Sequence, residues 1–244
     1  MKDIDVYGPI GDDWDEDAVS ASEFVRQLRD AGGEDVTVHI NSSGGSVFDA
    51  NAMSEAVRSY RGRITASIEG LAASAASYFA LAADEVVVNP AALVMIHNPW
   101  DIEVGDSSAM RRKADMLDKA RSTISGQYAR KTGREVSEIE GLMDAETWFT
   151  ASEAVEFGLA DRVTDEEPVA ACLKPEDMKR FRNAPKGLFT SDERKPADET
   201  RNDAGDPRDS FADADDSDAE AGAAETVAGA ATRTVCVNGQ FLYE

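Results

Sequence analysis

The chain has 244 residues, of which 48 are acidic and 25 basic, so its formal net charge is -23. This charge argues against binding to the phosphate backbone of nucleic acids. The longest apolar runs are far below the ~18 residues of a membrane span, and the start, MKDIDVYGPIGDDWDED, has no apolar core of a secretory signal. We therefore expect a cytoplasmic protein that binds neither nucleic acid nor membrane.

The first 165 residues alternate strand and helix patterns. One helix is indicated by apolar residues at i, i+3, i+4 and i+7, namely Ala21, Phe24, Val25 and Leu28. Strands are predicted at 4–8, 36–40, 64–68, 85–88 and 92–96, and helices at 18–33, 47–60, 74–83, 107–133, 136–143 and 150–158. Strands repeatedly separated by helices predict an α/β fold with parallel, right-handed βαβ connections.

A glycine-rich loop follows the second strand, in HINSSGGSV, residues 39–47. Gly44 and Gly45 stand where the strand gives way to a helix, so main-chain N–H groups and the helix N-terminus would both face the loop. Such a site suits an oxyanion or a phosphate. Taken alone, the motif fits an ordinary tight turn as well.

Two serines lie among small residues in EGLAASAAS, after the third strand. Ser74 stands at the strand–helix junction, a position similar to a nucleophile elbow, although the G-x-S-x-G spacing is not met. Ser77 is about one turn further, where a hydroxyl can bond back to a carbonyl. By itself, Ser74 could simply be the N-cap of the helix.

The sequence contains two histidines. His97 ends the strand before Asn98-Pro99, where a base can act at a sheet edge, whereas His39 is mid-strand and is expected to be a packed or surface side chain. Ser74 and His97 at strand ends of one α/β unit form a reasonable nucleophile–base pair. A third group should orient the imidazole, and GLMDAETWFTASEAVEFGL offers Asp144, Glu146, Glu153 and Glu156, the last two on a predicted helix where we expect them to be solvated.

The composition changes near residue 165. Residues 191–225 carry 13 acidic and 4 basic residues with a single aromatic, too little apolar surface to offset the entropy of ordering. We therefore divide the chain into a domain at 1–166 and an acidic, largely disordered tail at 167–244. The final TVCVNGQFLYE regains strand character around an Asn-Gly turn signal and fits a hairpin or a docking peptide.

Four motifs follow one another over residues 3–165: INSSGGSV, EGLAASAASYFALAA, LVMIHNP and TASEAVEFGLAD. In this order and approximate spacing they resemble the proteolytic subunit of the Clp protease, and most closely the Clp-type head-maturation (prohead) proteases encoded beside viral capsid genes. The resemblance implies the Clp/crotonase fold, a spiral of repeated ββα units with parallel sheets and a protruding handle helix, here from Ser107 to Lys131. An amphipathic helix of this length could also cover its own core.

The resemblance also implies the roles of the site residues. Ser74 matches the nucleophile and His97 the general base, with oxyanion donors on the main chain of Gly44 or Gly45 and of Ala75. No metal and no cofactor is implied. Glu146 falls where the family has its third residue, an aspartate, and Asp144 is the substitute candidate.

From this resemblance we expect an ATP-independent serine endopeptidase that processes capsid or scaffold proteins during viral head maturation. A homo-oligomeric ring, stacked or single, is implied by kinship. Clp subunits engage an unfoldase through an N-terminal extension, and since this chain starts almost at the first strand, we expect no ATPase partner. The acidic tail would be a tether, an assembly-regulating segment, or a solvated tail without a specific partner.

Two other functions fit the same fold. A crotonase-type enzyme uses a similar Gly-Gly oxyanion loop to bind acyl-CoA thioesters, but needs no serine–histidine pair. Alternatively, the protein is a catalytically silent scaffold that templates capsid assembly through its tail. Labelling of Ser74 by a fluorophosphonate would exclude the first, and cleavage of a capsid protein would exclude the second.

Overall fold

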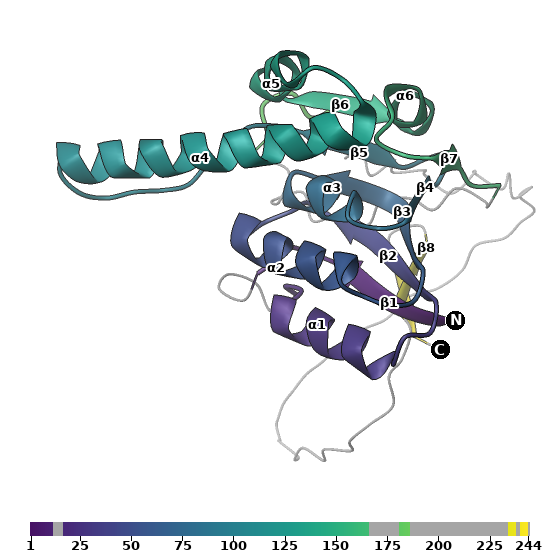
Figure 1. The fold of residues 1–244 in the computed structure, drawn as a ribbon. Helices are drawn as coiled ribbons and strands as arrows, with labels where there is room; N and C mark the ends of the chain where they lie inside the picture. The colour runs from purple at the N-terminus through teal and green to yellow at the C-terminus, as the bar shows by residue number, and fades with distance from the viewer. Residues whose placement is uncertain (12–16, 166–180, 186–233, 238–239, 244) are drawn as a thin grey trace, which may run out of the picture.

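The computed structural model describes residues 1–11, 17–165, 181–185, 234–237 and 240–243. Strands and helices alternate along most of it (Figure 1). The strands are β1 (Lys2–Tyr7), β2 (Val36–Ser42), β3 (Ile64–Ala73), β4 (Glu85–Val88), β5 (Leu93–Ile96), β6 (Thr147–Thr150), β7 (Arg162–Val163), β8 (Thr234–Val237) and β9 (Gln240–Tyr243). The helices are α1 (Ala21–Asp30), α2 (Val47–Arg58), α3 (Ala75–Ala80), α4 (Ser107–Thr132), α5 (Val136–Asp144) and α6 (Ala151–Phe157).

The main sheet is mostly parallel, as predicted, with the order β1-β2-β3-β4-β7. Strand β3 is long enough to pair twice. Its first part, Thr65 to Ile68, pairs with β4, and its last part, Leu71 to Ala73, pairs with β5. Strand β6 then adds antiparallel to β5. This fork puts the ends of β3 and β5 side by side.

The core lies on the face of the sheet that α1 and α2 cover (Figure 1). In β1 the side chains alternate: Ile4 and Val6 are buried, whereas Asp3, Asp5 and Tyr7 are exposed. Successive residues of a strand point to opposite faces, so this pattern gives the sheet one apolar and one polar face.

Helix α4 is the predicted handle and projects well beyond the sheet (Figure 1). Its N-cap is Asp106, whose side chain accepts hydrogen bonds from the N–H groups of Ser108 and Ala109, and its C-cap is Gly133 with φ of 72°. Its buried residues are Ile124, Ser125 and Tyr128. The C-terminal part therefore covers the core while the N-terminal part extends from it. No helix in the described parts of the chain is long and apolar enough to cross a membrane.

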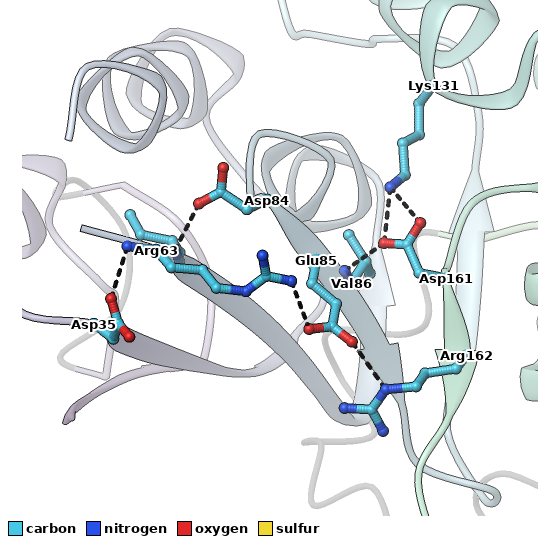
Figure 2. A network of polar contacts seen from close by, with 9 residues as sticks. Asp35, Arg63, Asp84, Glu85, Val86, Lys131, Asp161 and Arg162 are labelled. Atoms are coloured by element: carbon cyan, nitrogen blue, oxygen red, sulfur yellow. Dashed lines mark hydrogen bonds and ion pairs between the residues drawn. The ribbon is translucent and has the colours of Figure 1, made fainter. Parts of the chain in front are cut away.

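A network of hydrogen bonds and ion pairs lies at the edge of the sheet where the parallel strands begin (Figure 2). Asp84 accepts a hydrogen bond from the N–H of Ile64 at the start of β3 (2.7 Å), and Asp161 accepts one from Val86 in β4 (2.7 Å). Glu85 pairs with both Arg63 and Arg162. Carboxylates thus take up main-chain donors at this edge of the sheet.

Every predicted helix and strand has a counterpart, but two strands were missed. No strand was predicted at β6 or β7, because β7 has only two residues and β6, TWFT, lacks the apolar run that marks β4, EVVV. At the other end of the chain, β8 and β9 form an antiparallel pair, which confirms the hairpin interpretation. Most of the predicted tail at 167–244, including the acidic stretch at 191–225, lies outside the described residues.

Candidate active site

Ser74 stands between β3 and α3 with φ of 56° and ψ of -122°. A positive φ is uncommon for a residue with a side chain and is often found at functional sites. Ser74 occupies the N-cap position of α3, but its hydroxyl makes no capping bond to that helix. Its Oγ instead lies 2.8 Å from Nε2 of His97.

The pairing of β3 with β5 explains this contact. Ala73 is in register with Met95, and the N–H of Ser74 donates to the carbonyl of Met95 at 2.9 Å. His97 follows directly after β5, so its ring reaches the junction that carries Ser74. Both residues are partly exposed, which leaves the pair accessible from solvent.

Ser77 has a different environment. It is 1% exposed, and its hydroxyl contacts the carbonyls of Ser74 and Met95 and the hydroxyl of Tyr128, each within 2.8 Å. Burial raises the pKa of Tyr128, so that partner stays neutral. Ser77 therefore bonds back to a carbonyl, as expected, and ties α3 to β5 and α4.

The Gly-Gly loop passes against the same junction. Gly44 has φ of 85°, and a Cβ on it would lie 2.5 Å from the carbonyl oxygen of Ala73 and 2.8 Å from the nitrogen of Ala75. A Cβ on Gly45, where φ is 152°, would overlap the carbonyl oxygen of Ile10. Only glycine allows so close an approach of the loop to Ser74 and to Ile10.

The two glycines differ in their N–H groups. That of Gly44 donates to Oγ of Ser42 at 3.1 Å. Gly45 lies between two hydrogen bonds to Ile10: the carbonyl of Gly44 accepts from the N–H of Ile10, and the N–H of Ser46 donates to the carbonyl of Ile10. The N–H of Gly45 itself has no acceptor within the described residues. The N–H of Ala75 opens helix α3 and has no intrahelical acceptor. Gly45 and Ala75 thus offer the donors that an oxyanion requires.

The two candidate acids are held by other groups. Glu146 is 4% exposed with φ of 50°, and its carboxylate accepts hydrogen bonds from Trp148 Nε1 (3.4 Å) and from the main-chain N–H groups of Arg182 (2.9 Å) and Asn183 (2.6 Å). These contacts do not assign Glu146 as the partner of His97, and its role stays a prediction.

Asp144 lies at the end of α5 with 59% of its side chain exposed. It accepts hydrogen bonds from Asn98 Nδ2 (2.7 Å) and Arg121 (3.0 Å), and Arg121 Nε also donates to Oδ1 of Asn98 at 3.0 Å. Asp144 therefore contacts the residue after His97. Glu153, in contrast, forms a capping box with Thr150 at the start of α6, a structural role.

Sequence reasoning missed one part of this site. Residues 181–185 were assigned to the tail, but they reach Glu146 and the ring of His97, to which the Phe181 ring stands edge-on at 5.5 Å between centroids. The one available signal was Phe181 itself, an aromatic residue in the otherwise polar stretch KRFRN.

His39 lies apart from this pair, in the middle of β2. Its Nδ1 is 2.5 Å from Glu69 and its Nε2 is 3.2 Å from Asp3, and the hydrogen bond with Glu69 is the main reason that its pKa is raised to about 9. Among the described residues, no group of three or more histidine, cysteine or acidic side chains is arranged to hold a metal.

The chain is similar to known proteins in sequence and in fold. The family model described as Clp protease matches residues 2–167. The chain is 33% identical over 156 residues to ATP-dependent Clp protease proteolytic subunit 1 of Protochlamydia amoebophila, covering 60% of this chain and 75% of the relative. It is 30% identical over 138 residues to the protein of that name from Prochlorococcus marinus, covering 56% and 70%.

Among solved structures, the ClpP1 N165D mutant from Listeria monocytogenes matches with a TM-score of 0.59. The match covers 67% of this chain and 91% of that chain at 22% sequence identity. At this identity the likeness shows a shared fold.

Proposed function

Because the chain belongs to the Clp protease family, which indicates a serine-type peptidase, we propose that it is an ATP-independent endopeptidase that processes capsid or scaffold proteins during viral head maturation. The observation that carries the catalytic part is the 2.8 Å contact between Ser74 Oγ and His97 Nε2, at a junction whose backbone is held in an unusual conformation.

In the proposed reaction, His97 takes the hydroxyl proton while Ser74 Oγ attacks the peptide carbonyl carbon. The resulting oxyanion accepts hydrogen bonds from the N–H groups of Gly45 and Ala75, and removal of one such donor typically costs ~3 kcal/mol of barrier. The imidazolium then protonates the leaving amine, and the same imidazole activates the water that hydrolyses the acyl-enzyme. No metal or cofactor takes part.

The third member of the triad is proposed to be Glu146, with Asp144 as the substitute. The burial of Glu146 supports its assignment, because a carboxylate that is only 4% exposed is held in a fixed position next to the site. Asp144 is supported by its bond to Asn98, the neighbour of His97. Replacing each by its amide, Glu146→Gln and Asp144→Asn, should lower the rate more strongly for the residue that orients the imidazole.

The proposed assembly is a homo-oligomeric ring, single or stacked, in which the projecting part of α4 contacts another copy. It would act in the host cytoplasm or the procapsid. Family membership and the projection of α4 (Figure 1) support this proposal, while the viral role rests on the sequence resemblance.

Labelling of the full chain with a fluorophosphonate tests the catalytic part. We expect the wild type to be labelled on Ser74, and the Ser74→Ala and His97→Ala variants to lose labelling. Ser67→Ala is a matched control, because Ser67 is a buried serine on the same strand but not beside His97. Equal labelling of wild type and Ser74→Ala would contradict the proposal and would favour the crotonase-type alternative.

The substrate is tested separately, with a viral capsid protein as the candidate substrate. We expect the wild type to cleave it and Ser74→Ala to leave it intact. Normal capsid assembly with the Ser74→Ala variant and no cleavage by the wild type would instead support a silent scaffold.

A further inference from the structure

Residues 181–185 lie beyond the family match, which ends at residue 167, yet they pack against the candidate site. We call them the brace segment. Phe181 is 7% exposed and joins an apolar cluster with Leu71, Ala73 and Met95, each fully buried. These three residues belong to the ends of β3 and β5 that carry Ser74 and His97.

The ring of Phe181 forms one wall beside the imidazole. It stands edge-on to His97 at 5.5 Å and to Trp148 at 5.7 Å between ring centroids. Edge-to-face contacts of this kind fix the relative orientation of two rings. Trp148 comes from β6, so Phe181 fills the space between the strand after Glu146 and the base.

The main chain of the brace segment holds Glu146. The N–H groups of Arg182 and Asn183 donate to its two carboxylate oxygens, at 2.9 and 2.6 Å, and Nδ2 of Asn183 donates to the carbonyl of Ala145 at 2.7 Å. A buried carboxylate is tolerated only when hydrogen bonds replace its hydration. The segment thus provides what the burial of Glu146 requires.

The brace segment does not seal the site. Ser74 and His97 both stay partly exposed with the segment in place, which argues against a plug that must leave before substrate binds. The contacts instead restrict the imidazole and the turn at Glu146, the two groups whose orientation matters for proton transfer.

We propose that the brace segment is a positioning element of the active site, with Phe181 orienting the His97 ring and the Arg182 and Asn183 amides fixing Glu146. This inference rests on the proposed function, because it concerns the same serine–histidine pair. A displacement of about 1 Å at a reacting group can lower a rate ~100-fold, so loss of the Phe181 ring should be visible in the rate of chemistry.

The test compares two buried phenylalanines under the same change, Phe181→Leu and Phe24→Leu. Phe24 is 1% exposed and stands edge-on to Phe79 at 5.2 Å, away from the site. For each full-length variant, saturable labelling by a fluorophosphonate gives a maximal rate and a half-saturating concentration, normalised to the folded fraction. We expect Phe181→Leu to lower the maximal rate about tenfold with the half-saturating concentration within twofold, and Phe24→Leu to change neither.

A second variant, Asn183→Ala, removes the bond to the carbonyl of Ala145 without deleting an apolar side chain. We expect it to lower the maximal labelling rate about threefold. Wild-type rates in both Phe181→Leu and Asn183→Ala would overturn the positioning role. Absence of labelling in the wild type would instead refute the proposed function, so the two failures are distinguishable.

Discussion

The two edges of the parallel sheet use their main-chain N–H groups in opposite ways. Where the strands begin, aspartates accept hydrogen bonds from these groups, as Asp84 does from Ile64 and Asp161 from Val86 (Figure 2). Where the strands end, the N–H of Ala75 has no acceptor within helix α3, and the N–H of Gly45 has none among the described residues. One edge satisfies its donors internally, and the other has two donors that we propose for an oxyanion.

The backbone differs between the edges as well. The only residues other than glycine with positive φ in the described parts of the chain are Ser74 and Glu146, and both lie at the site. A strained conformation costs of the order of 1–3 kcal/mol. The unfavourable backbone conformations of residues other than glycine therefore occur where chemistry is proposed. The opposite edge is held by ordinary ion pairs.

The largest effect is expected from matched glycine substitutions at the two edges. In Gly45→Ala the new Cβ would overlap the carbonyl oxygen of Ile10, so we expect a loss of about 3 kcal/mol or more in unfolding free energy and loss of labelling. Gly32 precedes β2 at the other edge with φ of 66°, and a Cβ there meets no atom within 4 Å, so Gly32→Ala should cost about 1 kcal/mol. Urea unfolding measures both, and similar losses would contradict the assigned packing.

A smaller effect on stability is expected from removing a carboxylate acceptor at the edge where the strands begin. Asp161→Ala leaves the N–H of Val86, a residue 0% exposed, without its carboxylate acceptor and Lys131 without its partner. We expect a loss of about 1–3 kcal/mol with an unchanged labelling rate per folded molecule. The control is Arg162→Gln, which removes an exposed ion pair with Glu85 and should cost less than about 1 kcal/mol. A reduced labelling rate in Asp161→Ala would show that the two edges are coupled.

The smallest effect on stability is expected from the titration of His39, which lies on β2 between the two edges. The pKa of His39 is raised from 6.5 to about 9, chiefly by its hydrogen bond with Glu69. The folded protein therefore binds the proton more tightly than the unfolded chain does, and the resulting stabilisation is complete below pH 6.5 and is lost as the pH rises through about 9. Since water reaches this group, we expect a decline of the order of 1 kcal/mol.

Unfolding midpoints measured across that pH range in wild type and His39→Gln would show the decline in the first and its absence in the second. A parallel decline in both proteins would assign the pH dependence to other groups.

Sequence reasoning reached the elements with a strong local pattern. The helices α1 and α4 and the strand β2 carry periodicity within their own residues, and β4 is marked by three consecutive valines, so all four were predicted. The convergence of Ser74 and His97 followed from two strand ends in one α/β unit, and the pairing of Ala73 with Met95 supplies the reason. The difference between the N–H groups of Gly44 and Gly45 could not be predicted, because it depends on the hydrogen bond from Gly44 to Ser42 and on the packing of Gly45 against Ile10.

The brace segment was beyond the reach of sequence reasoning for a physical reason. Its five residues have no period, and its partners come from β3, β5 and β6, which are distant in sequence. Phe181 stands in a stretch rich in arginine and lysine, so composition pointed to solvent. The burial of Glu146 could not be anticipated either, because the two N–H groups that compensate it belong to residues 182 and 183.

The position of Phe181 late in the chain has a consequence during translation. Synthesis proceeds from the N-terminus, so Ser74 and His97 leave the ribosome well before the residues that pack against them. A nascent or prematurely terminated polypeptide would carry Ser74 and His97 without the brace segment. The full proposed activity would then appear only in polypeptides whose synthesis has passed the family match, which ends at residue 167, and reached the brace segment.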